Sequence, residues 1–300
     1  MIAGIYFYLK YIIYMKYIKG GYTMASAICA PSELENLSKT PLLCLGDKGE
    51  VFYELALAMI DTISDNNRQG RETAIICPVG PTGQYPVFVR LVNRDGISLK
   101  NCLFINMDEY LNDDGDYIDI SSPLSFRGYM RDHVYAGLRP DLLMDESRRI
   151  FPDPSNPSEI TDLLEAFGGA DLVIGGAGIN GHIAFNEPQP ELSNEQFMRL
   201  GTRALDIAEA TRATNAAGSL DGDLSQMPRR CVTVGMSDIL AARKIRIGLF
   251  RDWQAGVLRR YILDGIDSGF PLSFLKTHPD TQILASRNVW ERTAQMLRQP

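Results

Sequence analysis

The stretch DLVIGGAGINGHIAFNEP, residues 171–188, decides the fold class and marks a candidate site. Its apolar residues 172–174 have the length and branching of a buried parallel strand. The glycines that follow allow a tight turn and a close approach of the backbone to a ligand; they are Gly175, Gly176, Gly178 and Gly181. The turn also carries the densest group of proton-transfer and hydrogen-bonding side chains in the chain, namely Asn180, His182, Asn186 and Glu187. Because open α/β sheets bind ligands at the carboxyl ends of their strands, we expect a ligand site in this loop.

Segments typical of strands and helices alternate around this stretch. Short apolar runs predict further strands at 73–77, 102–107, 231–234, 245–250 and 282–285. Amphipathic patterns predict a long helix within 31–70 and shorter ones at 87–93, 125–135, 160–167 and 253–266. Most of the strands are apolar on both faces. The sequence therefore predicts an α/β fold with a doubly wound, mostly parallel sheet and helices on both faces.

Residues 1–24 differ in composition from the rest of the chain. They are rich in Ile and Tyr, and lysines interrupt their apolar runs, which are shorter than the roughly 20 residues that span a bilayer. Two interpretations stay open: a start-site artefact, with translation beginning at Met24, or a membrane or export segment. We favour the first, because no basic stretch precedes the apolar part. In either case we place 1–24 outside the core and expect residues 25–300 to form a single α/β domain.

Composition narrows the class of partner and the compartment. A net charge of −7 argues against nucleic acid, because proteins that follow a phosphate backbone carry a basic stripe. It does not exclude a small anionic substrate. The five cysteines are odd in number and include no CxxC pair, so we expect a cytoplasmic protein without a disulfide framework and without a metal site. We also expect no membrane partner.

Two other segments follow predicted strands and add candidate groups. A Gly/Pro-rich loop at 78–86 separates a strand from a helix, where backbone N–H groups and the helix dipole favour an anion, although such loops also serve as simple turns. Asp108 and Glu109 follow the strand at 102–107, where carboxylates either serve acid–base chemistry or cap a helix. The acidic loop at 111–121 is a candidate lid.

The motifs resemble one family. GGAGINGHIAFNEP, residues 175–188, is similar to the G-x-G-x-D-G-H-I-A-F-N-E-P signature of the glucosamine-6-phosphate deaminase/isomerases. Its NEP ending differs from the G-H-T-A-S-L-F-P of the related 6-phosphogluconolactonases. Four more segments resemble the family in order and spacing: GPTG at 80–83, MDEY at 107–110, TVG at 233–235 and LKTHP at 275–279. Together they cover most of residues 72–286.

The resemblance implies a Rossmann-like fold of the sugar-phosphate isomerase type. It also implies an aldose–ketose isomerisation with loss of ammonia, from glucosamine 6-phosphate to fructose 6-phosphate. In that reaction His182 would move the ring-oxygen proton as the pyranose opens, Asp108 would move a proton from C2 to C1, and Glu187 would assist ring opening, with Asn180 beside them. The implied substrate contacts are Gly80, Thr82, Gly83, Gln84, Glu109, Gly178, Gly181 and Arg212. The resemblance implies no metal or organic cofactor, a sugar phosphate as ligand, and a homo-oligomer as in many members.

The sequence departs from the family at the candidate catalytic and phosphate-binding positions. Asn180 stands where the family has Asp, and an amide carries no charge to stabilise an imidazolium. At an analogous histidine-orienting position, that of the serine-protease triad, Asp to Asn costs about 10⁴ in turnover. Gln84 and Tyr85 add bulk to the loop, and Ala217 and a position near Ala255 replace the family's phosphate-binding Arg and Lys. Three arginines lie near enough in sequence to substitute: Arg251, Arg259 and Arg260.

Three functions therefore stay open. The first is an active amino-sugar-phosphate deaminase/isomerase, acting on glucosamine 6-phosphate or a close variant such as galactosamine 6-phosphate. The second is a catalytically impaired paralogue that binds a sugar phosphate as a sensor or regulator, which the change at Asn180 favours. The third is a hydrolase like the 6-phosphogluconolactonases, against which the NEP ending argues.

Overall fold

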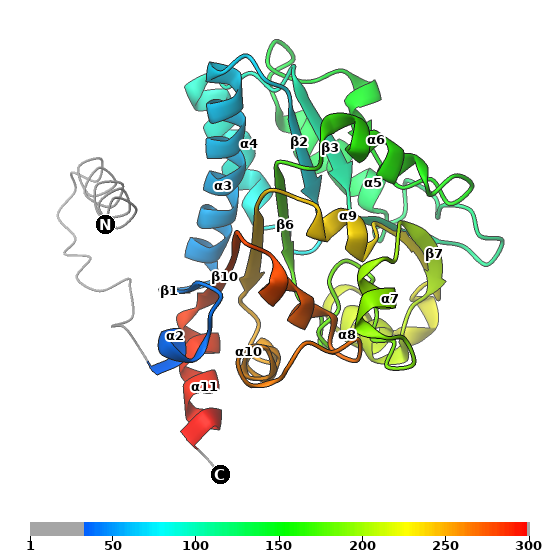
Figure 1. The fold of residues 1–300 in the computed structure, drawn as a ribbon. Helices are drawn as coiled ribbons and strands as arrows, with labels where there is room; N and C mark the ends of the chain where they lie inside the picture. Colours follow the sequence, from blue (N-terminus) through cyan, green and yellow to red (C-terminus); the bar gives the residue numbers. More distant parts are fainter. Residues whose placement is uncertain (1–32, 299–300) are drawn as a thin grey trace.

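A computed structural model describes residues 33–298 (Figure 1), in which a seven-stranded sheet forms the centre. Its strand order is β1-β10-β9-β6-β2-β3-β5, and every neighbouring pair runs parallel. The strands are β1 (Leu42–Leu45), β2 (Thr73–Cys77), β3 (Cys102–Asn106), β5 (Arg149–Ile150), β6 (Leu172–Gly176), β9 (Ile245–Leu249) and β10 (Thr281–Ser286). The predicted parallel α/β sheet is therefore confirmed.

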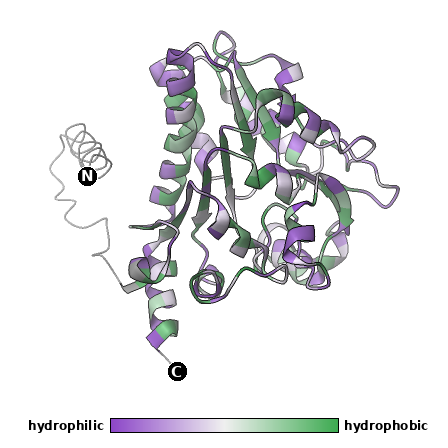
Figure 2. Ribbon diagram, viewed as in Figure 1, coloured by the Kyte–Doolittle hydropathy of each residue, from purple (hydrophilic) through white to green (hydrophobic). Residues whose placement is uncertain are grey.

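Helices cover both faces of this sheet. The helices of residues 33–298 are α2 (Glu33–Leu37), α3 (Lys48–Arg68), α4 (Gln84–Asp95), α5 (Phe126–Tyr129), α6 (Glu159–Phe167), α7 (Asn194–Met198), α8 (Glu209–Ser219), α9 (Met236–Leu240), α10 (Gln254–Leu263) and α11 (Arg287–Arg298). Of these, α8 packs away from this sheet, beside Ile207 and Cys231. Figure 1 shows α3 along one side of the strands and α6 and α9 on the other. Successive strand residues point to opposite faces, so Ile75 packs with α3 and α4 whereas Ile76 packs with α6 and α10. This alternation is why the central strands β2 and β3 consist mainly of apolar residues (Figure 2).

A second, three-stranded sheet corrects one expectation. It is antiparallel, in the order β4 (Asp108–Leu111), β8 (Arg230–Thr233), β7 (Arg203–Asp206). The run at 231–234 was expected in the parallel sheet, because its apolar pattern does not show which strand it pairs with. The chain leaves the main sheet at Met107, whose N–H donates to Cys77 O and whose carbonyl accepts from Val234 N–H. Asp108 therefore begins a new strand instead of lying in a loop.

Some elements differ from the sequence pattern. The strands β1, β5 and β7 and the helix α11 were not predicted, and the first three have only two to four residues. The helix expected at 125–135 is divided into α5, a π-helical turn over Met130–Val134 and a 3₁₀ turn over Tyr135–Gly137. The helix expected from 87 begins three residues earlier, at Gln84. Periodicity indicates that a segment is helical more reliably than where its ends lie.

Within residues 33–298, no helix is long and apolar enough to cross a bilayer. The expectation that residues 1–24 stand outside the core falls outside the described part of the chain. The single domain over 25–300, the cytoplasmic location and the homo-oligomer stay predictions. Cys77, Cys102 and Cys231 are buried free thiols.

Candidate active site

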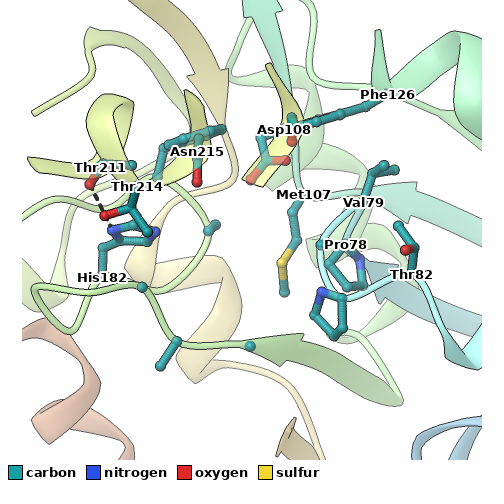
Figure 3. Close-up of a pocket in the computed structure, with 18 of the residues that line it drawn as sticks. Pro78, Val79, Thr82, Met107, Asp108, Phe126, His182, Thr211, Thr214 and Asn215 are labelled. Carbon is teal, nitrogen blue, oxygen red and sulfur yellow. Dashed lines mark hydrogen bonds between the residues drawn. The ribbon is translucent and has the colours of Figure 1, made fainter. Parts of the chain in front are cut away.

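A cavity of about 290 Å³ lies at the carboxyl edge of the main sheet (Figure 3). Four of its lining segments end or follow strands: 78–82 after β2, 107–108 after β3, 176–179 at the end of β6 and 250–254 after β9. The helix α8 and the segment 123–126 provide further walls. The loop after β6 therefore lies where ligands of open α/β sheets bind.

His182 reaches this cavity from a tight turn after β6. The turn is closed by the Gly178 N–H, which donates to His182 O at 3.0 Å, and by the Gly181 N–H, which donates to Gly178 O at 3.0 Å. A Cβ at Gly178 would lie 1.9 Å from His182 Cε1, and a Cβ at Gly181 would lie 2.2 Å from the Phe270 ring. Gly181 also has φ +85°, in the left-handed region. Both glycines are therefore required by the turn that holds the imidazole.

Asn180 joins His182 to Glu187 and fixes the direction of each hydrogen bond. Its Nδ2 donates to Glu187 Oε2 at 2.6 Å, and its Oδ1 lies 2.9 Å from His182 Nδ1. An ionised carboxylate only accepts, so the amide nitrogen must face Glu187 and the amide oxygen must face the ring. The Nδ1 atom of His182 then carries the proton, and Nε2 of the neutral ring keeps its lone pair for the cavity. An uncharged residue at 180 thus still selects the tautomer that a base requires.

Glu187 is buried behind this pair, at the start of α8. Its Oε1 accepts from the Ala208 N–H at 3.3 Å, at the helix N-terminus where a negative charge is favoured. Burial raises the pKa of Glu187, but hydrogen bonds and charge from His182, with hydrogen bonds from Asn180 and Thr211, outweigh it and hold the pKa below its ordinary value. Glu187 is therefore an anion that supports His182, whose Nδ1 lies 3.5 Å away.

Thr211 of α8 is a site residue that sequence reasoning missed. Its Oγ1 lies 3.1 Å from His182 Nδ1, and Thr211, Thr214 and Asn215 all line the cavity (Figure 3). Residues three and four apart share one helix face, so these three point the same way. Arg212, the next residue on this helix, was expected to contact substrate, whereas Thr211 was not.

Asp108 lines the cavity across from His182 (Figure 3). Its side chain is 7% exposed, and within residues 33–298 no hydrogen bond or ion pair to its carboxylate is present. Burial, and secondarily the charge of Glu109, raise its pKa well above the ordinary range. A carboxyl group that is buried, unpaired and open to a cavity is typical of a proton-transfer residue.

Glu109 points away from the cavity, although it was expected to contact substrate. Its carboxylate accepts hydrogen bonds from Ser125 Oγ (3.0 Å), Phe126 N–H (3.1 Å) and Arg127 N–H (2.9 Å), and Arg127 Nε donates to it at 3.2 Å. Arg127 also packs over the Tyr117 ring, 4.2 Å from its centre. Glu109 thus anchors both the 123–126 wall and the segment that was expected to be a lid.

Other predicted contacts also lie behind the lining. Gln84 Nε2 donates to Pro81 O at 2.8 Å and the Tyr85 hydroxyl donates to Pro78 O, so both buried side chains brace the loop from below instead of filling the cavity. The Arg212 guanidinium donates to Pro228 O, Leu224 O and Met227 O. Asn186 is likewise buried, donating to Val234 O and accepting from Arg203.

The structure divides the predicted residues into two groups. Those in the cavity lining are Asp108, His182, Gly80, Thr82 and Gly178. Those outside it are Asn180, Glu187, Gly83, Gln84, Glu109, Gly181 and Arg212. In the second group, Asn180 and Glu187 belong to the network behind His182, and Glu109 accepts a hydrogen bond from Ser125 of the cavity wall. Within residues 33–298, no group of three or more His, Cys, Asp or Glu side chains could hold a metal ion.

Curated proteins similar in sequence are glucosamine-6-phosphate deaminases or a protein named after them. The chain is 29% identical over 242 residues to a glucosamine-6-phosphate deaminase of Bacillus velezensis, covering 78% of this chain and 93% of the relative. It is 26% identical over 245 residues to that of a Geobacillus species, covering 79% and 91%. A putative glucosamine-6-phosphate deaminase-like protein of Bacteroides thetaiotaomicron matches 84% of this chain at 26% identity, over 37% of its own length. No family model matches the chain.

Solved structures show the same fold. A monomeric glucosamine-6-phosphate deaminase superposes with a TM-score of 0.73 at 24% identity, covering 84% of this chain and 99% of that one. The 6-phosphogluconolactonase of Trypanosoma brucei gives 0.59 at 15% identity, covering 85% and 98%. The resemblance that the motifs indicate is thus confirmed in sequence and in fold.

Proposed function

We propose that this chain is an amino-sugar-phosphate deaminase/isomerase that converts glucosamine 6-phosphate, or a close variant, into a ketose phosphate and ammonia. The proposal rests on one observation: two side chains that are suited to proton transfer line the same cavity. His182 presents the lone pair of Nε2, and Asp108 presents an unpaired carboxyl group from the facing wall. Aldose–ketose isomerisation needs both groups, one to transfer a proton at the ring oxygen and one to transfer a proton between carbon atoms.

Ring opening is the step we assign to His182. Opening a pyranose moves a proton from the C1 hydroxyl to the ring oxygen, while the bond between C1 and that oxygen breaks. Nε2 takes the proton and returns it, and the imidazolium that exists between the two transfers is stabilised by Glu187 and by the hydrogen bonds of Asn180 and Thr211. The turn at Gly178 keeps the ring in place throughout.

Proton transfer between carbons is the step we assign to Asp108. In the open chain the ionised carboxylate removes the proton from C2 while the substrate ammonium group passes a proton to the aldehyde oxygen, which gives an enolamine. The carboxyl group then delivers its proton to C1. The resulting C2 iminium adds water and releases ammonia, which leaves the ketose. A single carboxylate that faces both carbons suffices for this transfer. A substrate ammonium group beside Asp108 would favour its ionised form.

The loop after β2 supports a phosphorylated substrate. Gly80, Pro81 and Thr82 line the cavity directly before α4, a helix of 12 residues. Backbone N–H groups and the dipole at such a helix start favour an anion. Gly83 permits the close packing of this loop on α3, since a Cβ there would lie 2.2 Å from the Phe52 ring.

The test is ammonia release by the purified protein given glucosamine 6-phosphate, with galactosamine 6-phosphate and glucosamine in parallel. We expect release from a phosphorylated amino sugar, loss of release in His182→Gln, and wild-type release in His133→Gln, which changes a histidine outside the cavity lining. Binding by His182→Gln, measured as thermal stabilisation by the same sugar phosphate, should persist.

Two other outcomes have defined meanings. No release from any of the three sugars, together with stabilisation by a sugar phosphate, would overturn the enzyme and favour a binding protein. Hydrolysis of a 6-phosphogluconolactone without ammonia release from amino sugars would favour a lactonase. Equal loss of binding and turnover in His182→Gln would overturn the role given to His182.

A further inference from the structure

The helix α8 runs along one wall of the cavity, so its start and its end mark two ends of the cavity. Thr211, at the start of this helix, lies beside His182, and Thr214, Asn215 and Ser219 continue along the same wall. Gly218, seven residues after Thr211, lies on the same face two turns further on, about 10 Å along the helix axis. The His182 end and the Gly218 end of the cavity are therefore about 10 Å apart, which one small ligand can span.

Arg251 lies at the Gly218 end. A Cβ at Gly218 would be 3.3 Å from Arg251 Nη1, so the guanidinium rests over the glycine and a larger residue would crowd it. Arg251 follows β9 and is held by Gln254, whose Oε1 accepts from the N–H groups of Phe250 (2.7 Å) and Arg251 (2.8 Å). The Gln254 side chain is in turn fixed on Ala177 O at 2.9 Å.

The charge of Arg251 is available to a ligand. Among residues 33–298, Arg251 is the one lysine or arginine that lines the cavity, and its guanidinium makes no ion pair or hydrogen bond there. The neighbouring Asp252 does not neutralise it, because Asp252 is bound by Arg292 at 3.0 Å. Of the other two arginines that the sequence offers, neither lines the cavity, and Arg260 is bound by Asp264 at 2.9 Å.

We infer that Arg251 binds the terminal anionic group of the substrate, at the end of the cavity opposite His182, and so selects a sugar phosphate over the free sugar. This inference rests on the proposed function. The reacting end of the sugar then faces His182 and Asp108, while the phosphate is held between Arg251 and the 80–82 loop. Arg251 is a specificity residue, and a guanidinium suits this task because it binds phosphate through paired donors.

The experiment compares Arg251→Gln with Arg259→Gln, a matched loss of an arginine that lies outside the cavity lining. For glucosamine 6-phosphate we expect KM to rise roughly 10- to 100-fold in Arg251→Gln, the range for one charge-assisted contact, with kcat changed much less. Inhibition by inorganic phosphate should weaken in parallel. Arg259→Gln should match the wild type, and Arg251→Lys should recover part of the loss.

The experiment distinguishes a failure of the Arg251 inference from a failure of the proposed function. If the wild type releases ammonia and the KM of Arg251→Gln equals that of Arg259→Gln, the inference is wrong and the proposed function stands. If the wild type releases no ammonia, the proposed function fails, and thermal stabilisation decides about Arg251. Stabilisation by glucosamine 6-phosphate but not by glucosamine, lost only in Arg251→Gln, would support the anion site, and any other pattern would overturn it.

Discussion

The amide nitrogen of Asn180 lies 2.6 Å from Oε2 of Glu187, and this contact sets the chemistry of the turn. It makes the amide a donor toward the buried carboxylate and an acceptor toward His182. From sequence alone, Asn at this position suggests an impaired site. The structure shows instead that the amide has a partner on each side, Glu187 on its nitrogen and His182 on its oxygen. Through this amide, the single carboxylate of Glu187 supports the imidazole.

Asn180→Asp should therefore destabilise the protein at neutral pH. It places a second carboxylate against Glu187, which raises the pKa of Glu187 through like charge and loss of a donor. A carboxyl whose folded pKa is raised loses stability as pH rises. We expect a loss of about 1–2 kcal/mol at pH 7.5 and a smaller loss at pH 4.5, from urea unfolding, with reduced ammonia release. Asn101→Asp, at an exposed position remote from the site, is the control. A rise in turnover of Asn180→Asp would contradict the role given to the amide.

Gly178→Ala should remove activity without unfolding the chain. The new Cβ would occupy the space of the His182 ring, 1.9 Å from Cε1, so the imidazole must move away from Asn180 and Thr211. We expect a fall in kcat of roughly 100-fold or more, since small displacements of a catalytic group have costs of that size. Gly256→Ala, where nothing lies within 4 Å of the added Cβ, should keep full activity. Steady-state kinetics and circular dichroism check both variants, and near-normal kcat in Gly178→Ala would contradict the geometry.

Much of the fold follows from the sequence, because burial on both faces makes each parallel strand a continuous apolar run. The strands at 73–77, 102–106 and 172–176 are of this kind. The small antiparallel sheet was beyond such reasoning, since β8 has the same apolar character although it pairs with β4 and β7. Very short strands such as β5, with two residues, leave no periodic signal at all.

Sequence patterns predicted only some of the site residues, for a similar reason. Motifs identified His182 and Asp108, which the structure places around one cavity. They could not show the direction in which a side chain points, so Glu109 and Arg212 were taken for substrate contacts although both are bound to protein groups. Thr211 was missed because a threonine in a helix has no distinctive pattern, and only its distance to His182 reveals it.

Glu109→Gln should weaken the fold and loosen one cavity wall. The carboxylate accepts from Ser125, Phe126 and Arg127, and an amide would turn an NH₂ group toward some of these donors. Leaving buried donors unpaired predicts a loss of about 2–4 kcal/mol in the free energy of unfolding. Glu195→Gln, whose carboxylate is exposed and paired with an exposed Arg199, should change stability by less than about 0.5 kcal/mol. Equal denaturation midpoints for the two variants would contradict the anchoring role.

Asp108→Asn should abolish turnover and stabilise the protein. Burial and the charge of Glu109 raise the pKa of Asp108, so the folded protein holds this proton more tightly than the unfolded chain does. For such a group the stability is complete below the unfolded pKa and is lost as pH rises, which means that the ionised Asp108 destabilises the fold at neutral pH. We expect Tm of Asp108→Asn to exceed that of the wild type by roughly 2 °C or more at pH 7.5, and the difference to shrink toward pH 3.5.

The same raised pKa predicts the pH profile of the wild type. The carboxylate must be ionised to remove the C2 proton, so kcat/KM should fall as pH drops through the pKa of Asp108, above the ordinary range for aspartate. Glu109→Gln removes the neighbouring charge and should move this acid limb to lower pH, which separates its electrostatic effect from its structural one. Calorimetry at several pH values and rate profiles from pH 4 to 9 test both parts. A destabilised Asp108→Asn, or an acid limb at the pH of an ordinary aspartate, would show that the cavity does not desolvate this carboxyl group.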